Sequence, residues 1–350
     1  MILLTLACLV AVAISFNTTY FLRTWLQKGG IMDVPNDRSS HTRPIPRGGG
    51  LGIMAGVLVG VVVIRWLSPF TPLPSLTFFL AWGLIAIISF LDDRHTLPAA
   101  VRFGVQALAA TLVVWDRGGL DTLPIPLPFS LDLGCWGLPL AWFWIMAVLN
   151  LFNFMDGING FAGVQAVLGG IFLAWIDPFG PGAVLGPVVA LASLGFLYFN
   201  AGKASIFMGD VGSVSLGFFF AAMPFYAQGQ APALQVYTTV FILWFFLADG
   251  AFTLLRRIFK GQKPWEAHRE HYYQQLVKSG WSHTRVVAVV MGTSGLFSLG
   301  TYLCLRYYPQ FSLLPLGVGL VLMLCYWILV RHVRKSAPTP SPSESEPSIS

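Results

Sequence analysis

The sequence predicts an all-α, polytopic integral membrane protein. Of its 350 residues, 55% are hydrophobic and only 10% are charged, whereas about a quarter of the residues of a soluble domain carry a charge. The mean hydropathy is +0.70. Apolar segments of roughly twenty residues recur along the whole chain, which is the length that a helix needs to cross a bilayer. The lipid bilayer is therefore the expected surrounding of most of the chain.

About eleven segments have the composition of membrane-spanning helices. They are residues 1–22, 51–67, 76–91, 101–115, 139–154, 161–176, 183–199, 212–227, 235–254, 286–305 and 312–330. The first lacks a basic start and an A-x-A cleavage site, so we expect a retained span rather than a signal peptide. We expect residues 1–335 to form one membrane-embedded domain, and the Ser-, Pro- and Glu-rich residues 336–350 to form a disordered cytoplasmic tail.

The basic residues predict the orientation, because cytoplasmic loops carry an excess of Lys and Arg. With the 23–50 loop inside and alternating spans, all but three of the 21 basic residues are cytoplasmic; the exceptions are Arg65, Arg117 and Arg306. The N-terminus is then outside and the C-terminus cytoplasmic. This bias accounts for the net charge of +6, so no nucleic-acid partner is required. The polar loops expected on the inner face are 23–50, 92–100, 155–160, 200–213 and 255–285.

The densest polar stretch follows the apolar run 139–149. It contains Asn153, Asp156 and Asn159 together with Gly157 and Gly160. Asn and Asp are costly in hydrocarbon, so polar groups at the end of a span indicate a functional site. The glycines interrupt the helix and let backbone N–H groups approach a ligand. The alternative is an ordinary helix end and turn, in which Asp-Gly and Asn-Gly are common.

The loop after the first span contains His41, Arg43 and Arg47, followed by the glycine run 48–50. Basic groups beside the membrane favour an anion site, and the glycines allow the loop to lie flat against a neighbouring segment. The alternative, a positively charged anchor on the inner side, explains the arginines but neither the histidine nor the glycines.

Two acidic clusters follow at the predicted inner face. Asp92 and Asp93 are adjacent and repel each other, which favours a cation-binding or proton-accepting role over a solvated helix end. Asp210 lies between glycines and precedes an apolar span, so its carboxylate can bind Mg²⁺ while the helix N-terminus receives phosphate oxygens. The alternative for Asp210 is a simple N-cap.

The last inner loop contains His268, Arg269 and His271. Histidines three residues apart on a helix share a face, and with the basic and aromatic neighbours they suit a nucleotide diphosphate. The alternative is a helix at the membrane interface. Asp249 lies near the inner end of the span before this loop, and we expect it to form a structural salt bridge with Arg256 and Arg257.

With these clusters, the chain resembles the polyprenyl-phosphate N-acetylhexosamine-1-phosphate transferases, the superfamily that includes the phospho-MurNAc-pentapeptide translocase and the enzymes that initiate O-antigen synthesis. The resemblance runs from about Asp33 to Trp281. It rests on five motifs in the same order: Asp-x-Pro-x-x-Arg-x-x-His with Gly-Gly, Leu-Asp92-Asp93, Asn153-x-x-Asp156-Gly-x-x-Gly160, Phe207-Met-Gly-Asp210-x-Gly-Ser, and a last loop that contains histidine.

The resemblance implies the transfer of a sugar-1-phosphate from a UDP-linked N-acetyl sugar to undecaprenyl phosphate, with release of UMP, in the bacterial plasma (inner) membrane. It implies that Asp210 binds Mg²⁺, with Mn²⁺ as an alternative, and that Phe207 stacks on uracil. Asp92 and Asp93 would lie near the attacking phosphate, and a homodimer is one assembly to test. The implied catalytic residues also include Asp156 and His271, and the substrate-binding residues are Asn153, Gly157, Asn159, Asn200, His41, Arg43, Arg47, His268 and Arg269.

Two departures from the family pattern bear on the subclass. The translocase branch has a lysine three residues after the Asp pair, where this chain has Thr96. Related initiating enzymes read His-x-His-His in the last loop, where this chain reads His268-Arg-Glu-His271-Tyr-Tyr. This variant resembles the branch that acts on 6-deoxy sugars such as UDP-FucNAc or UDP-QuiNAc, and UDP-GlcNAc is the alternative donor.

The rival from another functional class is a secondary transporter. Such proteins also keep carboxylates near membrane spans, but they are expected to have an internal repeat and broken helices at the midplane of the bilayer. The sequence shows no repeat, and its polar clusters are predicted at one face.

Overall fold

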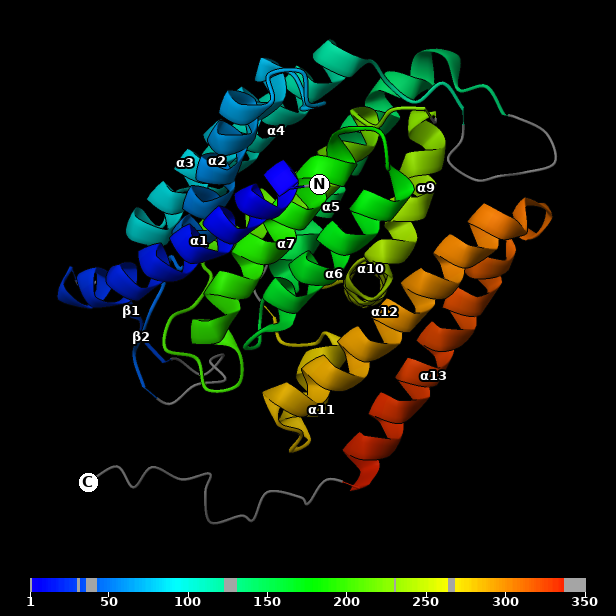
Figure 1. Cartoon of the computed structure of the whole chain (residues 1–350). Helices are drawn as coiled ribbons and strands as arrows, with labels where there is room; N and C mark the ends of the chain where they lie inside the picture. Colours follow the sequence, from blue (N-terminus) through cyan, green and yellow to red (C-terminus); the bar gives the residue numbers. More distant parts are fainter. Residues whose placement is uncertain are drawn as a thin grey trace, which may run out of the picture.

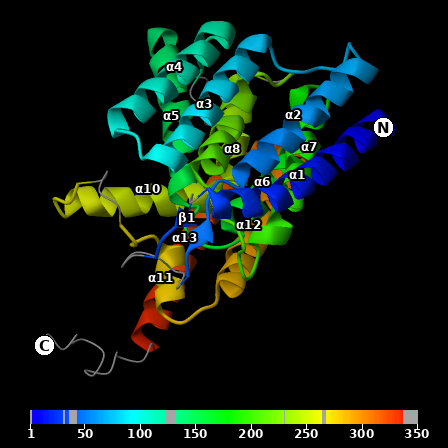
Figure 2. The same cartoon turned by 90° about the vertical axis from the view of Figure 1, so that its left-hand side faces the viewer.

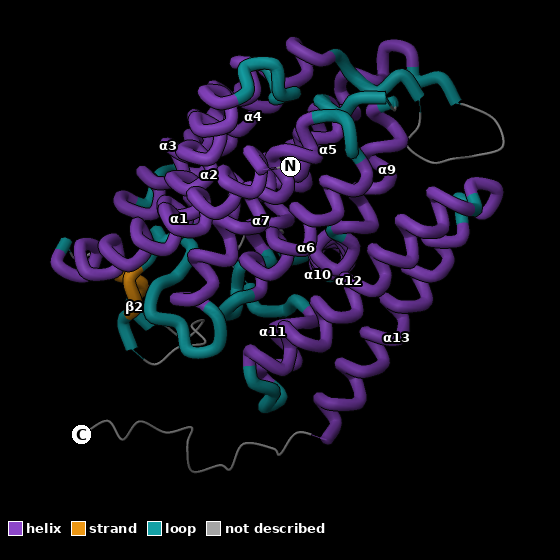
Figure 3. Tube along the Cα trace, in the orientation of Figure 1, coloured by secondary structure: helices purple, strands orange, loops and turns teal. Residues whose placement is uncertain are grey.

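The computed structural model describes residues 2–29, 32–35, 43–122, 131–229, 231–263 and 268–336. Within these ranges the protein is helical apart from one short hairpin, as predicted (Figures 1 and 3). The α-helices are α1 (Ile2–Lys28), α2 (Gly50–Leu67), α3 (Leu76–His95), α4 (Ala99–Arg117), α5 (Gly137–Phe154), α6 (Phe161–Ile176), α7 (Pro181–Asn200), α8 (Asp210–Ala222), α9 (Pro232–Ile242), α10 (Trp244–Phe259), α11 (Tyr272–Lys278), α12 (His283–Tyr307) and α13 (Leu314–Ser336).

The minor elements are short. Strand β1 (Met32–Asp33) pairs antiparallel with β2 (Ile45–Pro46), so that Met32 lies opposite Pro46. Three 3-10 turns, η1 (Gly134–Trp136), η2 (Met223–Phe225) and η3 (Pro309–Phe311), precede or extend helices. The predicted disordered tail, apart from Ser336 at the end of α13, lies outside the described residues.

Eight of the described helices are long and apolar enough to cross a membrane, or nine spans if the bent pair α9 and α10 counts as one. The chain is thus a polytopic helical membrane protein. All eleven segments expected from the sequence are helical, but α6 and α8 are shorter than a full span.

The span predicted over 235–254 is not one continuous helix. Helices α9 and α10 meet at an angle of 81°, and Figure 2 shows α10 running across the bundle rather than along it. A bend of this size leaves backbone carbonyls without helical partners, which is costly in a membrane unless side chains satisfy them. Gln165 Nε2 of α6 donates to Ile242 O at 2.9 Å, and Ser298 Oγ of α12 donates to Phe241 O at 3.3 Å. Neighbouring helices therefore stabilise the break.

Helix α8 lies in the middle of the bundle, between α3, α5 and α2. Each of its residues after Asp210 is buried. Phe218 and Phe219 pack on α3, where the Phe219 ring stacks on Trp82 at 5.3 Å between centroids, and Phe220 stacks on Phe152 of α5. Because α8 is enclosed by apolar side chains, the residue at its N-terminus, Asp210, has a fixed position.

Small residues bring α1, α2 and α7 into close contact. A Cβ atom at Gly52 would overlap Thr19 of α1, and one at Gly60 would lie 2.9 Å from Val188 of α7. Close backbone approach through small residues is the usual way in which membrane helices associate. This packing fixes the start of α2 and therefore the loop that precedes it.

The loops that carry the predicted motifs gather at one end of the bundle. The β1–β2 hairpin, the turns before α6 and α8, and the segment leading into α11 all lie at the lower end in Figure 1, whereas the N-terminus of α1 lies toward the other end. The loops that carry the predicted clusters therefore lie near one another, and the side of the membrane that they face stays a prediction.

Candidate active site

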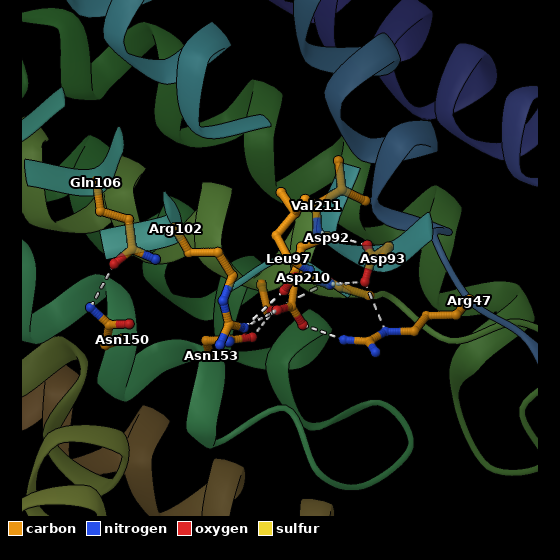
Figure 4. Close-up of polar contacts among 12 residues, drawn as sticks. Arg47, Asp92, Asp93, Leu97, Arg102, Gln106, Asn150, Asn153, Asp210 and Val211 are labelled. Carbon is orange, nitrogen blue, oxygen red and sulfur yellow. Dashed lines mark hydrogen bonds and ion pairs between the residues drawn. The ribbon is translucent and has the colours of Figure 1, made fainter. Parts of the chain in front are cut away.

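Asp93, near the end of α3, is held by the N-terminus of α8. Its carboxylate accepts hydrogen bonds from Asp210 N at 2.9 Å and Val211 N at 3.0 Å (Figure 4). The first N–H groups of a helix have no partner within the helix, and the helix dipole favours a negative charge there. The side chain of Asp93 is only 1% exposed. Asp93 therefore caps α8 from another helix.

Arg47 links Asp93 to Asp210. Its Nε lies 2.8 Å from Asp93 Oδ1, and its Nη2 pairs with Asp210 Oδ1. Burial lowers the pKa of Arg47, but the carboxylates of Asp210 and Asp93 outweigh burial and raise it. The guanidinium thus bridges two carboxylates that would otherwise repel each other.

The loop around Arg47 is fastened to the loop before α8 by main-chain bonds. Phe207 N donates to Pro46 O at 2.8 Å, and Gly49 N donates to Phe207 O at 2.8 Å. A Cβ atom at Gly50 would overlap Gly212 of α8. The prediction that the glycine run lies flat against a neighbour is confirmed, and this contact fixes where Arg47 can reach.

Arg102 of α4 makes a second bridge. Its Nη1 lies 2.8 Å from Asp92 Oδ2 and 3.8 Å from Asp210 Oδ2. Asp92 also accepts a hydrogen bond from Leu97 N at 2.6 Å, which closes the turn between α3 and α4. Thr96 allows this turn by adopting a left-handed conformation with φ of 48°. The turn brings Arg102 back over Asp92 (Figure 4).

Four carboxyl groups and two guanidinium groups define this cluster, so the acidic groups outnumber the basic ones. Asp156 belongs to it electrostatically: burial raises its pKa well above the usual value, Asp210 and Asp93 raise it further, and Arg47 opposes the shift. No group of three or more His, Cys, Asp or Glu side chains among the described residues forms a complete metal site. One or two carboxylates with room for phosphate oxygens is, however, the arrangement that Mg²⁺ prefers, and Asp210 fits it.

The predicted nucleotide-pocket residues have mixed surroundings. Asn153 accepts a hydrogen bond from Ser213 Oγ of α8. Asn200 is buried; it accepts from Gly160 N at 2.7 Å and donates to Ile206 O at 3.0 Å. Asn159 donates to Gly202 O at 2.7 Å. Asn159 and Asn200 thus join the 155–160 loop to the 200–209 loop. The side chain of Phe207 is half-buried.

His271 and His268 do not share a helix face, so that prediction was wrong. Helix α11 begins only at Tyr272, with His271 as its N-cap, and residues 268–270 are irregular. The two imidazole rings nevertheless lie 4.9 Å apart. Burial and the neighbouring His271 and Arg257 lower the pKa of His268 to about 4. His268 is therefore neutral near pH 7.

The His271 segment reaches the carboxylate cluster through Gly157. A Cβ atom at Gly157 would overlap the Tyr273 hydroxyl and lie 2.9 Å from Gln274 Nε2. The Tyr273 hydroxyl also donates to Phe154 O at 3.2 Å. Gly157 therefore acts as a contact surface for α11, next to Asp156.

The remaining predictions have different outcomes. Arg43 is exposed and Arg269 is half-buried, and His41 lies outside the described residues. The expected salt bridge of Asp249 with Arg256 and Arg257 is absent, because both arginines pair with Glu270, at 3.2 Å and 2.8 Å.

Sequence reasoning missed Arg102 as a site residue. It lies ten positions after Asp92, and the only signal was a basic residue one turn into the helix that follows the Asp pair.

A cavity of about 100 Å³ lies beside Arg102, and apolar side chains form one part of the cavity wall. The lining residues are Ile88, Ser89, Asp92, Ala99, Arg102, Phe103, Gln106, Asn150, Asn153, Phe154, Asp210 and Val214.

A helical membrane bundle with paired carboxylates and arginines at one end has charged groups suited to binding phosphorylated substrates and divalent cations. Residues 75–228 match the sequence profile of glycosyl transferase family 4. The matched segment covers less than half of the chain, and the chain is similar to the polyprenyl-phosphate sugar-1-phosphate transferases of this family.

Curated relatives match most of the chain. It is 29% identical to a probable undecaprenyl-phosphate N-acetylglucosaminyl 1-phosphate transferase of Bacillus subtilis, over 85% of this chain and 84% of the relative. It is 27% identical to the decaprenyl-phosphate N-acetylglucosaminephosphotransferase of Mycolicibacterium smegmatis, over 92% and 87%. It is 28% identical to the undecaprenyl-phosphate alpha-N-acetylglucosaminyl 1-phosphate transferase of Escherichia coli K12, over 91% and 87%.

Proposed function

We propose that the protein transfers an N-acetylhexosamine-1-phosphate from a UDP-sugar to undecaprenyl phosphate at the inner face of the bacterial plasma membrane. An oxygen of the lipid phosphate attacks the β-phosphorus of the UDP-sugar, the bond from that phosphorus to the bridging oxygen breaks, and UMP leaves. The product is a sugar-diphospho-undecaprenol that initiates O-antigen or another surface polysaccharide. The observation that carries the proposal is the cluster of Asp92, Asp93, Asp210, Arg47 and Arg102 beside the lined cavity.

The two guanidinium groups have separate tasks in this proposal. Arg102 and Asp92 line the cavity together with apolar residues such as Phe103, so Arg102 is suited to hold the phosphate end of the lipid. Arg47 lies on the other side of Asp210, where the nucleotide diphosphate would approach. Both reactants are polyanions, so positioning and charge neutralisation supply most of the rate enhancement.

The structure favours Asp92 over Asp93 as the carboxylate beside the attacking phosphate. Asp93 already accepts two backbone N–H bonds and pairs with Arg47, and it does not line the cavity. Asp92 lines the cavity and directly contacts Arg102. Asp93 then acts by holding Arg47 and the N-terminus of α8 in place.

The cluster suits a divalent cation held by Asp210. When bound, Mg²⁺, or Mn²⁺ in its place, neutralises charge on the diphosphate as UMP leaves. Arg47 and Arg102 keep the Asp210 carboxylate oriented from two sides.

We propose a 6-deoxy N-acetyl sugar such as UDP-FucNAc or UDP-QuiNAc as donor, because the last loop reads His271-Tyr-Tyr rather than His-x-His-His. UDP-GlcNAc is the second candidate, since the names of the relatives specify N-acetylglucosaminyl transfer. In the structure, Tyr273 and Gln274 of this loop pack against Gly157.

We further propose that all eleven apolar segments cross or enter the bilayer, with the N-terminus outside and the C-terminus cytoplasmic. The support is the distribution of basic residues together with the gathering of the motif loops at one end of the bundle.

The direct test is UMP release by the purified protein in detergent with undecaprenyl phosphate, Mg²⁺ and, in parallel, UDP-FucNAc, UDP-QuiNAc and UDP-GlcNAc. UMP release that depends on the lipid phosphate supports the reaction, and the ratio of kcat/KM values identifies the donor. No lipid-dependent UMP release with any donor would refute the proposed reaction, and a kcat/KM for UDP-GlcNAc equal to or above the others would refute the 6-deoxy preference alone.

A further inference from the structure

Asp249 of α10 is a fully buried carboxylate, 0% exposed. It accepts hydrogen bonds from Tyr272 N at 2.9 Å, Tyr273 N at 3.2 Å and Thr253 Oγ1 at 3.1 Å. The Nδ1 atom of His271 lies 3.5 Å from its Oδ1. Burying a carboxylate is costly unless hydrogen bonds and charge compensate for it. Of these four neighbours, three belong to the segment 271–273, and only the imidazole can carry a positive charge.

The same segment is tied to α10 a second time. Glu270 pairs with Arg256 and Arg257 of α10, and Arg257 also donates to Lys263 O at 3.1 Å. Helix α11 also packs against α13 and contacts α10. Two separate contacts therefore hold residues 270–273 to the helix that follows the 81° bend.

The position of Asp249 relative to His271 is specific. Both carboxylate oxygens are used by consecutive backbone N–H groups, so the start of α11 cannot rotate without losing one of them. His271 is the residue immediately before these N–H groups, and its ring is buried between His268 and Tyr273, at 4.9 Å and 5.8 Å between ring centroids. Carboxylates that orient an imidazole are a recurrent feature of sites in which histidine acts on a substrate.

We infer that Asp249 is a positioning residue of the active site, which fixes the orientation of the His271 imidazole toward the substrate through the start of α11. This inference rests on the proposed function, because it assumes that His271 contacts the UDP-sugar. It assigns a functional task to the only acidic residue of α10, for which the sequence suggested a salt bridge within its own helix.

The test is a double-mutant cycle with Asp249→Asn and His271→Gln, measured as kcat and as KM for the UDP-sugar. Asparagine keeps one acceptor oxygen but presents an amide N–H to the second backbone donor, so the start of α11 shifts. We expect Asp249→Asn to lower kcat tenfold or more, and we expect it to lower kcat by less than threefold when His271 is already glutamine. Equal losses in both backgrounds would show that Asp249 does not act through His271 and would overturn the inference.

The matched control is Asp177→Asn at the opposite end of the bundle. Asp177 is also buried and accepts hydrogen bonds from two backbone N–H groups, Gly182 N at 2.8 Å and Gln228 N at 3.0 Å. We expect the two substitutions to lower the Tm in detergent to a similar extent, but only Asp249→Asn to lower the kcat of the folded protein. A similar loss of kcat in Asp177→Asn would show that general destabilisation explains the effect.

If Asp249→Asn does not yield folded protein, Thr253→Val takes its place in the cycle, because it removes one donor to the same Oδ1 atom. A smaller loss of kcat that disappears in the His271→Gln background supports the inference, and an unchanged kcat overturns it. Failure of the proposed function is a different result: the unmutated protein would then release no UMP with any donor.

Discussion

Substitution of Arg102 tests whether the lipid phosphate binds at Arg102 and the nucleotide diphosphate at Arg47. In Arg102→Met, the Nη1 contacts to Asp92 at 2.8 Å and Asp210 at 3.8 Å are lost, while the aliphatic part of the side chain is retained. A hydrogen bond to a charged group contributes roughly 1.5–3 kcal/mol. If Arg102 holds the lipid phosphate, kcat/KM for undecaprenyl phosphate should fall roughly ten- to hundredfold, since each 1.36 kcal/mol is about a factor of ten.

The assay varies undecaprenyl phosphate at saturating UDP-sugar, and then UDP-sugar at saturating lipid. Because the substitution also leaves Asp92 without its partner, Arg102→Lys is measured beside it; it keeps the charge and loses only the planar fork. We expect the lysine variant to recover most of the activity. An unchanged KM for the lipid with a raised KM for the UDP-sugar would place the nucleotide at Arg102 and refute the division of substrates.

Four further outcomes are expected. Asp210→Asn should lower the rate of sugar-phosphate transfer by several orders of magnitude while the protein still inserts and purifies, because asparagine caps helices well but binds Mg²⁺ poorly. Near-normal UMP release at the usual Mg²⁺ concentration would exclude the metal role. If the Phe207 ring stacks on uracil, Phe207→Ala should weaken the binding free energy of free UMP, measured as an inhibitor, by roughly 1–3 kcal/mol. The loop should keep its structure, because the main-chain hydrogen bonds of Phe207 do not depend on the ring. An unchanged inhibition constant would show that the ring only packs against the protein. The pKa of His268 is lowered from 6.5 to about 4, so between these pH values the unfolded chain binds a proton that the folded protein does not, and the free energy of unfolding should fall as the pH drops from about 6.5 toward 4. His268→Gln should therefore make the Tm less dependent on pH in that range. The same dependence of Tm on pH in both proteins would contradict this. A reporter fused after Lys335 should be cytoplasmic and one at Gly119 external, and a C-terminal fusion that reports outside would disprove the span count.

The helices and the acidic motifs could be predicted because their signals are local. A long apolar run is enough to specify a spanning helix, and a glycine-flanked acidic residue at its edge is visible in a few positions. Asp210 was found in this way and Asp92 and Asp93 as an adjacent acidic pair, and the structure brings all three together with Arg47. The pairing of Arg47 with Asp210 itself joins residues 163 positions apart, so no local pattern could predict it.

The features that sequence reasoning missed or mistook all depend on contacts between distant segments. The bend between α9 and α10 is stabilised by Gln165, which lies 77 positions before the carbonyl that it satisfies. Arg102 acts through a turn that requires a left-handed Thr96, a conformation that a sequence pattern does not reveal. His268 and His271 seemed to fit one helix, but the carboxylate of Asp249 supplies the acceptors that let α11 start after His271.

The cap that Asp93 provides for α8 has a consequence for synthesis of the protein. The backbone N–H groups that it receives belong to residues 117 and 118 positions later in the chain. At about 5–20 residues per second, they leave the ribosome roughly 6 to 24 s after Asp93. During that interval Arg47, which is synthesised before Asp93, is available to neutralise the carboxylate at the bilayer edge. Arg47 would then act as a counter-ion of Asp93 during insertion. Once α8 has entered between α3 and α5, Arg47 would also pair with Asp210.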